Sequence, residues 1–213
     1  MKQLKTYINE TLKFSQSEYL NEWKASTSTV SSIDTKQYFV FTYKINRKSR
    51  IKIFHYMWNN FQKFRNNVYI NNEHIELDSY GWTKVNYEPG TYKVHIEDLN
   101  YINNSNVINS CANMFNECWQ LIEVPLFDTS YIKWMDKMFY RCSNLEKIPE
   151  FDTHNVTTMG SMFFHCTKLK DVPLLNTNSI EYIENMFKEC DNLSNETKKA
   201  WSKIYNFETH KMK

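Results

Sequence analysis

The sequence is poor in the two residues that most often interrupt regular structure. Its 213 residues include three glycines and four prolines, with 41% hydrophobic and 23% charged residues. This composition excludes a collagen-like or disordered chain and predicts one or two globular domains with a packed core. With so few glycines, the chain also has little means of bringing its backbone close to a phosphate group.

Long apolar runs are also missing. No run approaches the roughly 18 residues that a membrane-spanning helix needs, and Met1–Glu10 lacks the continuous apolar segment of a secretion signal. The net charge of +2 gives no global argument for nucleic acid. Five cysteines, all at or after Cys111, form an odd set that favours reduced thiols over a disulfide scaffold.

Catalytic motifs are absent as well. The sequence contains no H-E-x-x-H, no G-x-S-x-G and no Gly-rich phosphate loop, and its six histidines are scattered. His165 and Cys166 are adjacent, but neighbours on a helix point about 100° apart, so they do not form a pair. We therefore expect no enzyme, no cofactor and no metal site.

What the sequence does contain is a repeat. Several apolar residue types recur every 24 residues, which predicts stacked structural units. The four complete registers are Met114, Met138, Met162 and Met186; Phe115, Phe139, Phe163 and Phe187; Cys118, Cys142, Cys166 and Cys190; and Leu121, Leu145, Leu169 and Leu193. Because these cysteines form a ladder and do not converge on one point, we interpret them as buried thiols and not as zinc ligands.

The residue pattern of one repeat unit predicts a helix followed by a strand. Ile132, Met135, Met138, Phe139 and Cys142 have the spacing of an apolar helix face. Thr129 and Thr153 stand at the expected N-cap positions, and the segment from Leu145 to Pro149 reads as a short strand. Such a unit has one apolar face, so it must stack on its neighbours, and the predicted result is a solenoid with a parallel sheet.

The motif M-F-x-x-C-x-x-L-x-x-[VI]-P-x-F-D-T-x-x-[VI]-x-x-M resembles the BspA-type leucine-rich repeat, which also occurs in mycoplasma lipoproteins as 24–25-residue repeats. The resemblance covers Asn104 to Leu193. It implies a leucine-rich-repeat fold and a role in adhesion or protein contact. Members that act on cell surfaces usually carry an export signal or a lipobox cysteine, and we find neither in this sequence.

The segments on either side of the repeat predict different structures. Between residues 37 and 98, the residue pattern has the period of two that is typical of strands, as in Tyr38–Ile45 and Ile51–Trp58, and Val68–Leu77 is typical of a hairpin closed by Asn71 and Asn72. A strand over Thr91–Ile96 completes the pattern. Similar β-modules precede BspA-type repeats. After the repeat, Ser194 and Asn195 are expected to begin a helix with Ala200, Trp201, Ile204 and Phe207 on one side.

The predicted fold class is therefore α+β: a small antiparallel β-sandwich, then a short leucine-rich-repeat α/β solenoid with a C-terminal capping helix. The predicted divisions are a helix and a Ser/Thr-rich linker at 1–32, the β-module at 33–98, the repeats at 99–193, and the capping helix and tail at 194–213. Both faces of the β-module's strands carry apolar residues, so we expect a second sheet on one side and a neighbour on the other.

Two groups of residues are candidates for binding. The first contains large side chains at positions where the repeat departs from its own pattern, which are typical of contact hot spots or of packing against the flanking parts: Trp119, Trp134, Tyr140, Arg141 and Phe164. The second belongs to a stretch with no acidic residue between Thr35 and Asn72: Arg47, Lys48, Arg50, Lys52, Lys63 and Arg65. A solvated strand edge is the favoured interpretation of this basic group, with an acidic protein partner, nucleic acid or an anionic glycan as alternatives.

The expected function is that of a non-enzymatic protein-interaction or structural module within a larger assembly. Its partner would be a protein or a second copy of the chain, not nucleic acid. The resemblance, together with a composition rich in Asn, Lys, Ile and Tyr, leads to a bacteriophage virion as the specific assembly, in the particle or in the cytoplasm of the producing cell. The alternative is a bacterial cell-surface adhesin that binds a host protein or glycan.

Overall fold

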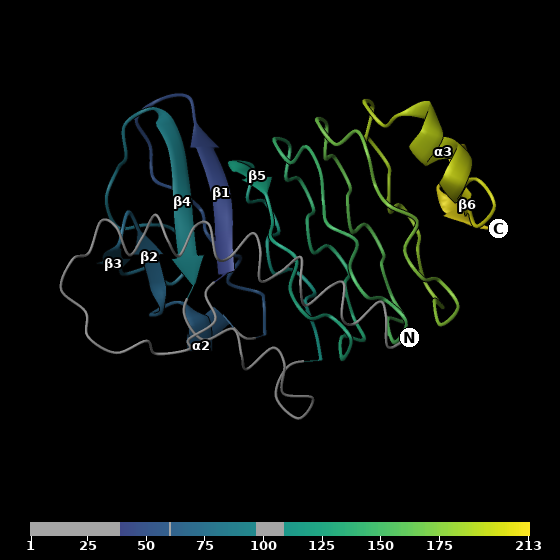
Figure 1. The fold of residues 1–213 in the computed structure, drawn as a ribbon, viewed down its shortest axis with the longest axis horizontal. Coiled ribbons are helices and arrows are strands. Elements are labelled where there is room, and N and C mark those ends of the chain that lie inside the picture. Colours follow the sequence, from purple (N-terminus) through teal and green to yellow (C-terminus); the bar gives the residue numbers. More distant parts are fainter. Residues whose placement is uncertain (1–38, 60, 97–108) are drawn as a thin grey trace. The chain divides into compact units, whose positions relative to one another are not determined.

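The computed structural model describes residues 39–59, 61–96 and 109–213, so the helix and linker expected at 1–32 lie outside the described residues. The described residues belong to one compact unit, Phe39–Lys213. Its elements, shown in Figure 1, are β1 (Phe39–Ile45), α2 (Phe61–Phe64), β2 (Val68–Ile70), β3 (Glu73–Ile75), β4 (Gly90–Ile96), β5 (Leu121–Glu123), α3 (Asn195–Trp201), β6 (Tyr205–Asn206) and β7 (Lys211–Met212). We call residues 39–96 the sheet region and residues 109–193 the repeat region.

The sheet region forms a five-stranded antiparallel sheet in the order β3-β2-β4-β1-β5. The hairpin between β2 and β3 turns at Asn71 and Asn72, which have φ values of 53° and 67°, as the sequence predicted. Asn tolerates this left-handed conformation better than most residues. The edge strand β5 comes from the repeat region and pairs with β1, so the two regions share one sheet.

The predicted β-sandwich is wrong, because the described residues of the sheet region contribute to a single sheet; the other sheet among the described residues is the two-stranded β6–β7 pair near the C-terminus. Ile51–Trp58 is not a strand: it makes an isolated bridge through Lys52 and otherwise runs irregularly, although Ile51, Ile53 and Phe54 are fully buried. Phe41 of β1 packs at 5.1 Å from Phe115 of the repeat region. The irregular segment and the first repeat therefore cover the sheet face for which a second sheet was expected.

The repeat region contains turns where helices were predicted. The amide of Met138 donates to the carbonyl of Met135, and that of Cys142 donates to Phe139, which closes successive four-residue turns. Amides inside these turns bond to the next unit, as Lys137 does to Gly160 and Arg141 to Phe164. An apolar residue every third or fourth position is common to a helix and to this succession of turns, so the spacing did not distinguish them.

These turns require positive φ at two positions in every unit. The first set is Asn113, Lys137, Ser161 and Asn185, with φ between 54° and 63°, and the second is Glu117, Arg141, His165 and Glu189, with φ between 57° and 62°. An L-residue with a Cβ atom pays an energetic cost of about 1–2 kcal/mol in this conformation. The recurrence of this geometry in each unit shows that the backbone repeats as faithfully as the apolar residues do.

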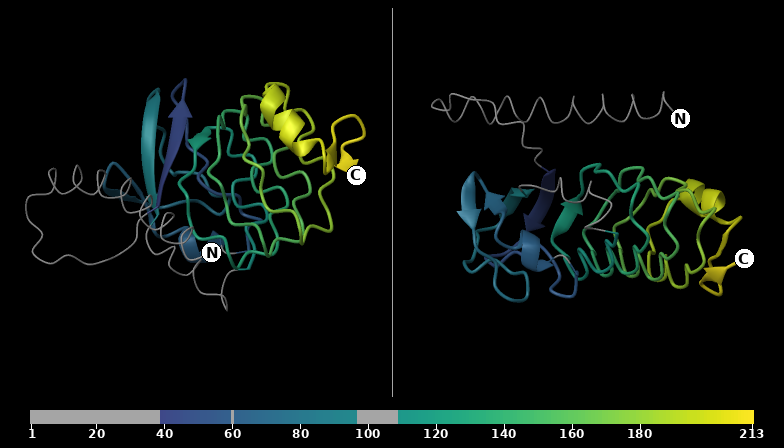
Figure 2. Two further views of the ribbon diagram at one scale, coloured as in Figure 1. Left: turned by 45° about the vertical axis from the view of Figure 1, so that its right-hand side comes forward. Right: turned by 90° about the horizontal axis from the view of Figure 1, so that it is seen from below.

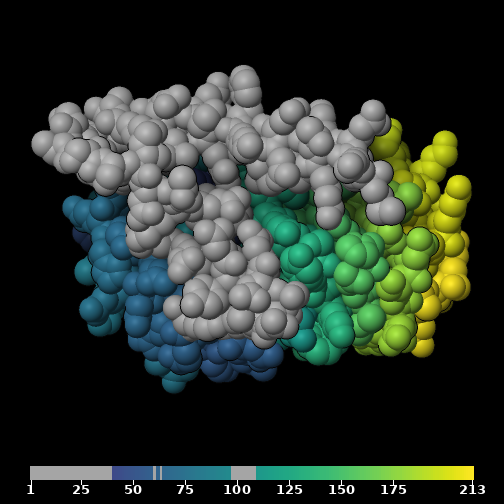
Figure 3. Space-filling view, turned by 60° about the horizontal axis from the view of Figure 1, so that its bottom comes forward, coloured from purple at the N-terminus to yellow at the C-terminus, as the bar shows by residue number. Residues whose placement is uncertain are grey.

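The interior of the repeat region is a regular stack. Phe115, Phe139, Phe163 and Phe187 follow one another at 5.7 Å between ring centroids. Thr129 and Thr153, which were expected to cap helices, instead donate their hydroxyl groups to the carbonyls of Asp152 and Asn176 in the next unit. Parallel pairing is confined to isolated bridges such as Trp134 with Ser110 and Thr158. Figures 2 and 3 show the units following one another in sequence order.

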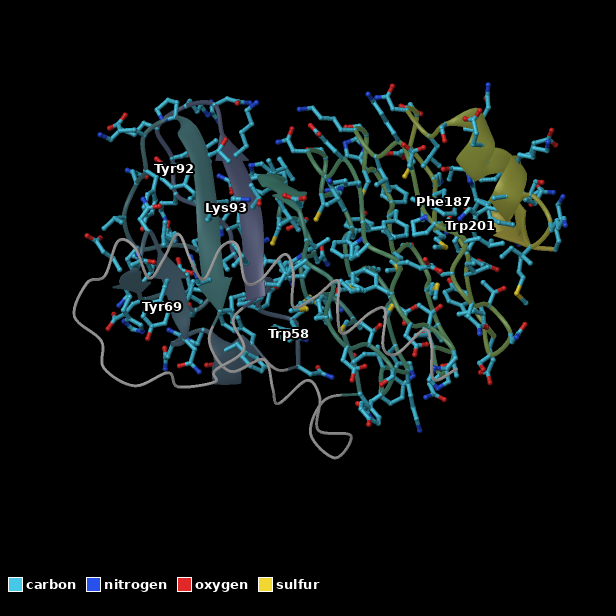
Figure 4. All side chains as sticks on the ribbon, in the orientation of Figure 1. Trp58, Tyr69, Tyr92, Lys93, Phe187 and Trp201 are labelled. Carbon is cyan, nitrogen blue, oxygen red and sulfur yellow. The ribbon has the colours of Figure 1, made fainter. Side chains whose placement is uncertain are left out.

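The C-terminal segment also differs from the prediction. Ser194 is the N-cap of α3, and its side chain accepts a hydrogen bond from the amide of Thr197, but the helix ends at Trp201. The chain continues into the small β6–β7 hairpin, so there is no capping helix reaching Phe207. Trp201 and Tyr205 pack edge-on against Phe187, as Figure 4 shows for Trp201.

The fold class was therefore predicted wrongly. Among the described residues, structure is mainly β-strand and turn, helices are limited to the short α2 and α3, and the helix–strand units of a leucine-rich-repeat solenoid do not form. The physical reason is that most backbone groups of a repeat unit find partners either within a four-residue turn or in the adjacent unit, and not along a helix.

Candidate binding surfaces

One candidate surface is a group of aromatic and cationic side chains on the repeat region. Tyr140 and Phe164 stack at 4.9 Å between ring centroids with an interplanar angle of 13°. The guanidinium of Arg141 lies 5.3 Å from the centroid of Tyr140, and the amine of Lys137 lies 6.0 Å from it. Both aromatic rings are partly exposed, whereas Phe139 and Phe163 beside them in the sequence are buried. We call Lys137, Tyr140, Arg141 and Phe164 the aromatic–cation cluster.

The structure brings together three of the five residues predicted for partner contact, namely Tyr140, Arg141 and Phe164. Trp134 lies in the row of bridging residues between Ser110 and Thr158, and its side chain is 41% exposed. Trp119 is also 41% exposed and packs edge-on against Trp82 of the sheet region, with 5.1 Å between the ring centroids. The predicted set is therefore divided among three places on the surface.

A second candidate surface is a groove where the sheet and repeat regions meet. It has a volume of about 620 Å³, and we call it the Trp groove. Its lining residues are Arg47, Lys48, Ser49, Arg50, Trp82, Asn86, Trp119 and Gln120. A volume of this size is typical of sites for small molecules.

The floor of the Trp groove is fixed by Gln120, whose side chain is buried. Its amide nitrogen donates to the carbonyl of Arg50 at 2.7 Å, and its amide oxygen accepts from the backbone of Lys52 at 3.0 Å. These bonds join the first repeat unit to the segment that follows β1. The two tryptophans are therefore held on a rigid base, which reduces the entropic cost of binding a ligand.

The cations of the Trp groove are partly neutralised. Lys48 forms an ion pair with Glu88, and Arg50 forms one with Asp78. Arg50 also lies 5.7 Å from the ring centroid of Trp82. Arg47 is exposed, and no residue in the described ranges forms an ion pair with it. Among the described residues, Arg47 is therefore the groove cation without an ion-pair partner.

The predicted basic surface is only partly assembled. Arg47, Lys48 and Arg50 meet at the groove, whereas the side chain of Lys52 is only 6% exposed and pairs with Glu117 at 3.3 Å. Arg65 lies over Phe61 and donates to the carbonyl of Leu77. Lys63 belongs to α2, and its side chain lies outside what the structure describes.

A partly buried charge network lies between the regions, with Lys52 and His55 buried and Glu117 and Arg141 partly exposed. Glu117 of the first repeat unit approaches Lys52 at 3.3 Å and His55 at 3.9 Å from the sheet region, and Arg141 at 3.9 Å from the next unit. Burial and the positive charge of Lys52 lower the pKa of His55 to about 4, against the opposing effect of Glu117. The backbone amide of Met57 donates to Nδ1 of His55, an interaction that requires this nitrogen to be unprotonated.

All five cysteines are buried and unpaired with one another. The thiols of Cys142, Cys166 and Cys190 each donate to the carbonyl of the phenylalanine in the preceding unit, at 2.8–3.0 Å. Burial raises the pKa of Cys118 to about 12 and that of Cys142 well above its ordinary value. Such thiols are poor nucleophiles. The Nδ1 atom of His165 lies 2.9 Å from the carboxylate of Glu189, so the hydrogen bond of this ring is with Glu189 and not with Cys166.

Sequence reasoning missed several residues of the Trp groove, namely Trp82, Asn86 and Gln120. Trp82 follows Gly81 in a stretch without a clear period, and Gln120 occupies a polar position of the repeat. The one available signal was Trp119, because the corresponding positions in the other units are Ser143, Thr167 and Asp191. Its contact with Trp82 depends on the sheet and repeat regions packing together.

Comparison with known proteins gives one match. The model of a family described as "Mycoplasma protein of unknown function, DUF285" matches residues 109–212, which include the repeat region and the C-terminal segment. No curated protein and no solved structure matches the chain. Within the described ranges, no helix has the length and apolar character needed to cross a membrane, and no three His, Cys, Asp or Glu residues are grouped so that they could hold a metal ion.

Proposed function

We propose that this protein is a non-enzymatic interaction or structural protein that forms part of a larger assembly, and that its repeats are of the BspA type. The aromatic–cation cluster is the observation that carries the proposal. Stacked aromatic rings beside an arginine are the side chains that dominate binding energy in protein interfaces. These four residues take no part in the buried phenylalanine stack, so packing of the core does not account for them. The proposed partner is a protein or a second copy of the chain.

A bacteriophage virion is the specific assembly that we propose, because of the repeat motif and the base composition that the sequence implies.

A bacterial surface adhesin is the second candidate. It is favoured by the Trp groove, an open depression in which Trp119 and Arg47 offer an aromatic ring and a cation to a ligand.

Quantitative mass spectrometry of gradient-purified particles and of washed cell surfaces from one producing culture tests these proposals. A fixed ratio to a capsid or tail protein in the particles supports the virion, and enrichment on cell surfaces supports the adhesin. Absence of the protein from both fractions contradicts the proposed assembly role.

A matched pair of variants tests the surface itself. Tyr140→Ala combined with Phe164→Ala should reduce incorporation into the assembly at least about tenfold, equivalent to about 1.4 kcal/mol. Tyr80→Ala, which removes an exposed tyrosine of the sheet region, serves as the control and should leave incorporation unchanged. Equal incorporation of both variants would show that the aromatic–cation cluster is not the contact surface.

A further inference from the structure

We infer that the Trp groove binds a sugar that carries a carboxylate, such as a uronic acid residue of an acidic polysaccharide. The inference concerns a different surface from the aromatic–cation cluster and does not depend on the proposed virion role; it deepens the second candidate function, the adhesin, which rests on the same groove. It rests on three features that the described residues of the groove show: an exposed indole ring, a cation without an ion-pair partner among these residues, and an exposed neutral amide.

The indole of Trp119 supplies the apolar contact. Its edge-to-face packing with Trp82 at 5.1 Å fixes the ring, and 41% of the side chain still faces solvent. Sugar rings present C–H groups on their faces, and these pack against an aromatic surface while the hydroxyl groups at the rim keep their hydrogen bonds. A core position does not explain Trp119, because the other repeat units have a small or polar residue there.

Arg47 supplies the charge. A guanidinium binds a carboxylate through two parallel hydrogen bonds, which gives orientation as well as affinity. The other two cations of the groove already have partners, since Glu88 pairs with Lys48 and Asp78 pairs with Arg50. Asn86 is exposed beside them and offers an amide to ligand hydroxyl groups.

The same balance of charges argues against nucleic acid and against a polyacidic peptide. Single-stranded nucleic acid is held by a continuous positive track along its phosphates, with several bases stacked in succession. Around the Trp groove, Asp78 and Glu88 offset two of the three cations and would repel a dense polyanion. In the part of the chain that the structure describes, the groove offers an exposed indole and a cation without an ion-pair partner, which match a ligand with one carboxylate per ring.

Saturation-transfer NMR and calorimetry on the purified full chain test the inference. The probes are tetragalacturonate, a hyaluronan tetrasaccharide and sialyllactose, each compared with its methyl ester, which keeps the rings but removes the negative charge. At least one acid should bind, and its methyl ester should bind at least tenfold more weakly. Binding should also weaken as salt is added, because a single ion pair contributes to it.

Variants locate the site. Trp119→Ala and Arg47→Gln should each reduce the affinity for the acidic sugar at least tenfold. Trp134→Ala is the matched control, because Trp134 has the same exposed fraction and lies outside the groove, and it should bind normally. Tyr140→Ala combined with Phe164→Ala should also bind normally, so that a failure of the proposed function is distinguished from a failure of this inference. Circular dichroism confirms that each variant is folded.

Four outcomes would overturn the inference. They are no binding of any acidic sugar, equal binding of acid and methyl ester, unchanged binding by Trp119→Ala, and tighter binding of an oligothymidylate or of a poly-glutamate peptide than of every sugar. The last result would assign the Trp groove to nucleic acid or to an acidic protein.

Discussion

The sheet region and the repeat region satisfy their backbone groups in different ways. In the sheet region, β1 and β4 are paired along seven residues each, in register from Phe39 with Ile96 to Ile45 with Gly90. In the repeat region, short turns alternate with single hydrogen bonds to the next unit. The sheet region therefore joins strands that are distant in sequence, whereas the repeat region joins residues that lie about one repeat unit apart in the sequence.

The two regions also build their cores differently. Phe115, Phe139, Phe163 and Phe187 stack at a constant 5.7 Å, whereas the rings of the sheet region, such as Phe54, Trp58 and Phe64, meet at varied angles. Phe115 belongs to both, because it also contacts Phe41 and Phe54. The periodic core and the irregular core therefore form one continuous hydrophobic core, and Phe115 contacts both parts of it.

The largest expected effect concerns the reactivity of the thiols. It reports on the repeat region alone, because all five cysteines lie at or after Cys111. Burial raises the pKa of Cys111, Cys118 and Cys190 to about 12, so at pH 8 the thiolate fraction is at least about a thousandfold below that of a free cysteine. Iodoacetamide labelling of the native protein should be slower by at least this factor. Rapid labelling of any one cysteine would show that its unit opens independently.

The next effect concerns the shared core. Phe139→Ala in the repeat region and Phe41→Ala in the sheet region should each lower the free energy of unfolding by about 3–5 kcal/mol, because both rings are fully buried. Urea unfolding followed by tryptophan fluorescence and by thiol exposure should give coincident transitions, since the two regions share one hydrophobic core. Two separate transitions would contradict this coupling.

The charge network at the boundary predicts a dependence of stability on pH. His55 has a pKa of about 4 in the folded protein, against about 6.5 when unfolded, so the unfolded chain binds a proton first as the pH falls. The stabilisation is complete above pH 6.5 and is lost between about pH 6.5 and 4, by roughly 3 kcal/mol in total. His55→Gln should flatten this part of the curve, measured by urea unfolding at several pH values. Parallel curves for the two proteins would rule out His55 as the source.

The smallest expected effect tests the positive φ values that distinguish the turns of the repeat region from the strands of the sheet region. Ser161 has a φ of 54°, so Ser161→Val should be less stable than Ser161→Gly by about 1 kcal/mol or slightly more. Thr91→Val is the matched control in β4, where a β-branched residue is favoured, and it should be neutral. Thermal unfolding measures all three variants. Equal stability of the two Ser161 variants would contradict the assigned turn geometry.

Parts of this fold could be predicted from the sequence. The 24-residue period identified buried residues correctly, including the methionine, phenylalanine, cysteine and leucine of every complete unit. The β2–β3 hairpin followed from Asn71 and Asn72, and the start of α3 followed from Ser194. These features depend on residues that are close in sequence or on strict repetition, both of which a single chain displays.

The remainder depended on information that the sequence does not carry locally. The helix prediction failed because turns at Lys137 and Arg141 reproduce the apolar spacing of a helix, and neither residue type favours positive φ. The Trp groove was missed for another reason. Trp82 and Trp119 meet because the sheet and repeat regions pack together, and Asp78 and Glu88 neutralise two of its cations only in the folded chain.

The turns of the repeat region have a consequence for how such a chain can evolve. The amides of Lys137 and Arg141 donate to carbonyls of the following unit, and those of Ser161 and His165 donate to the unit after that, so every internal unit presents the same donor edge on one side and the same acceptor edge on the other. An in-frame duplication or loss of one whole unit would leave every remaining edge with a matching neighbour. Gene recombination among the later units would change the length of the protein while the Trp groove, built from the sheet region and the first unit, is inherited intact.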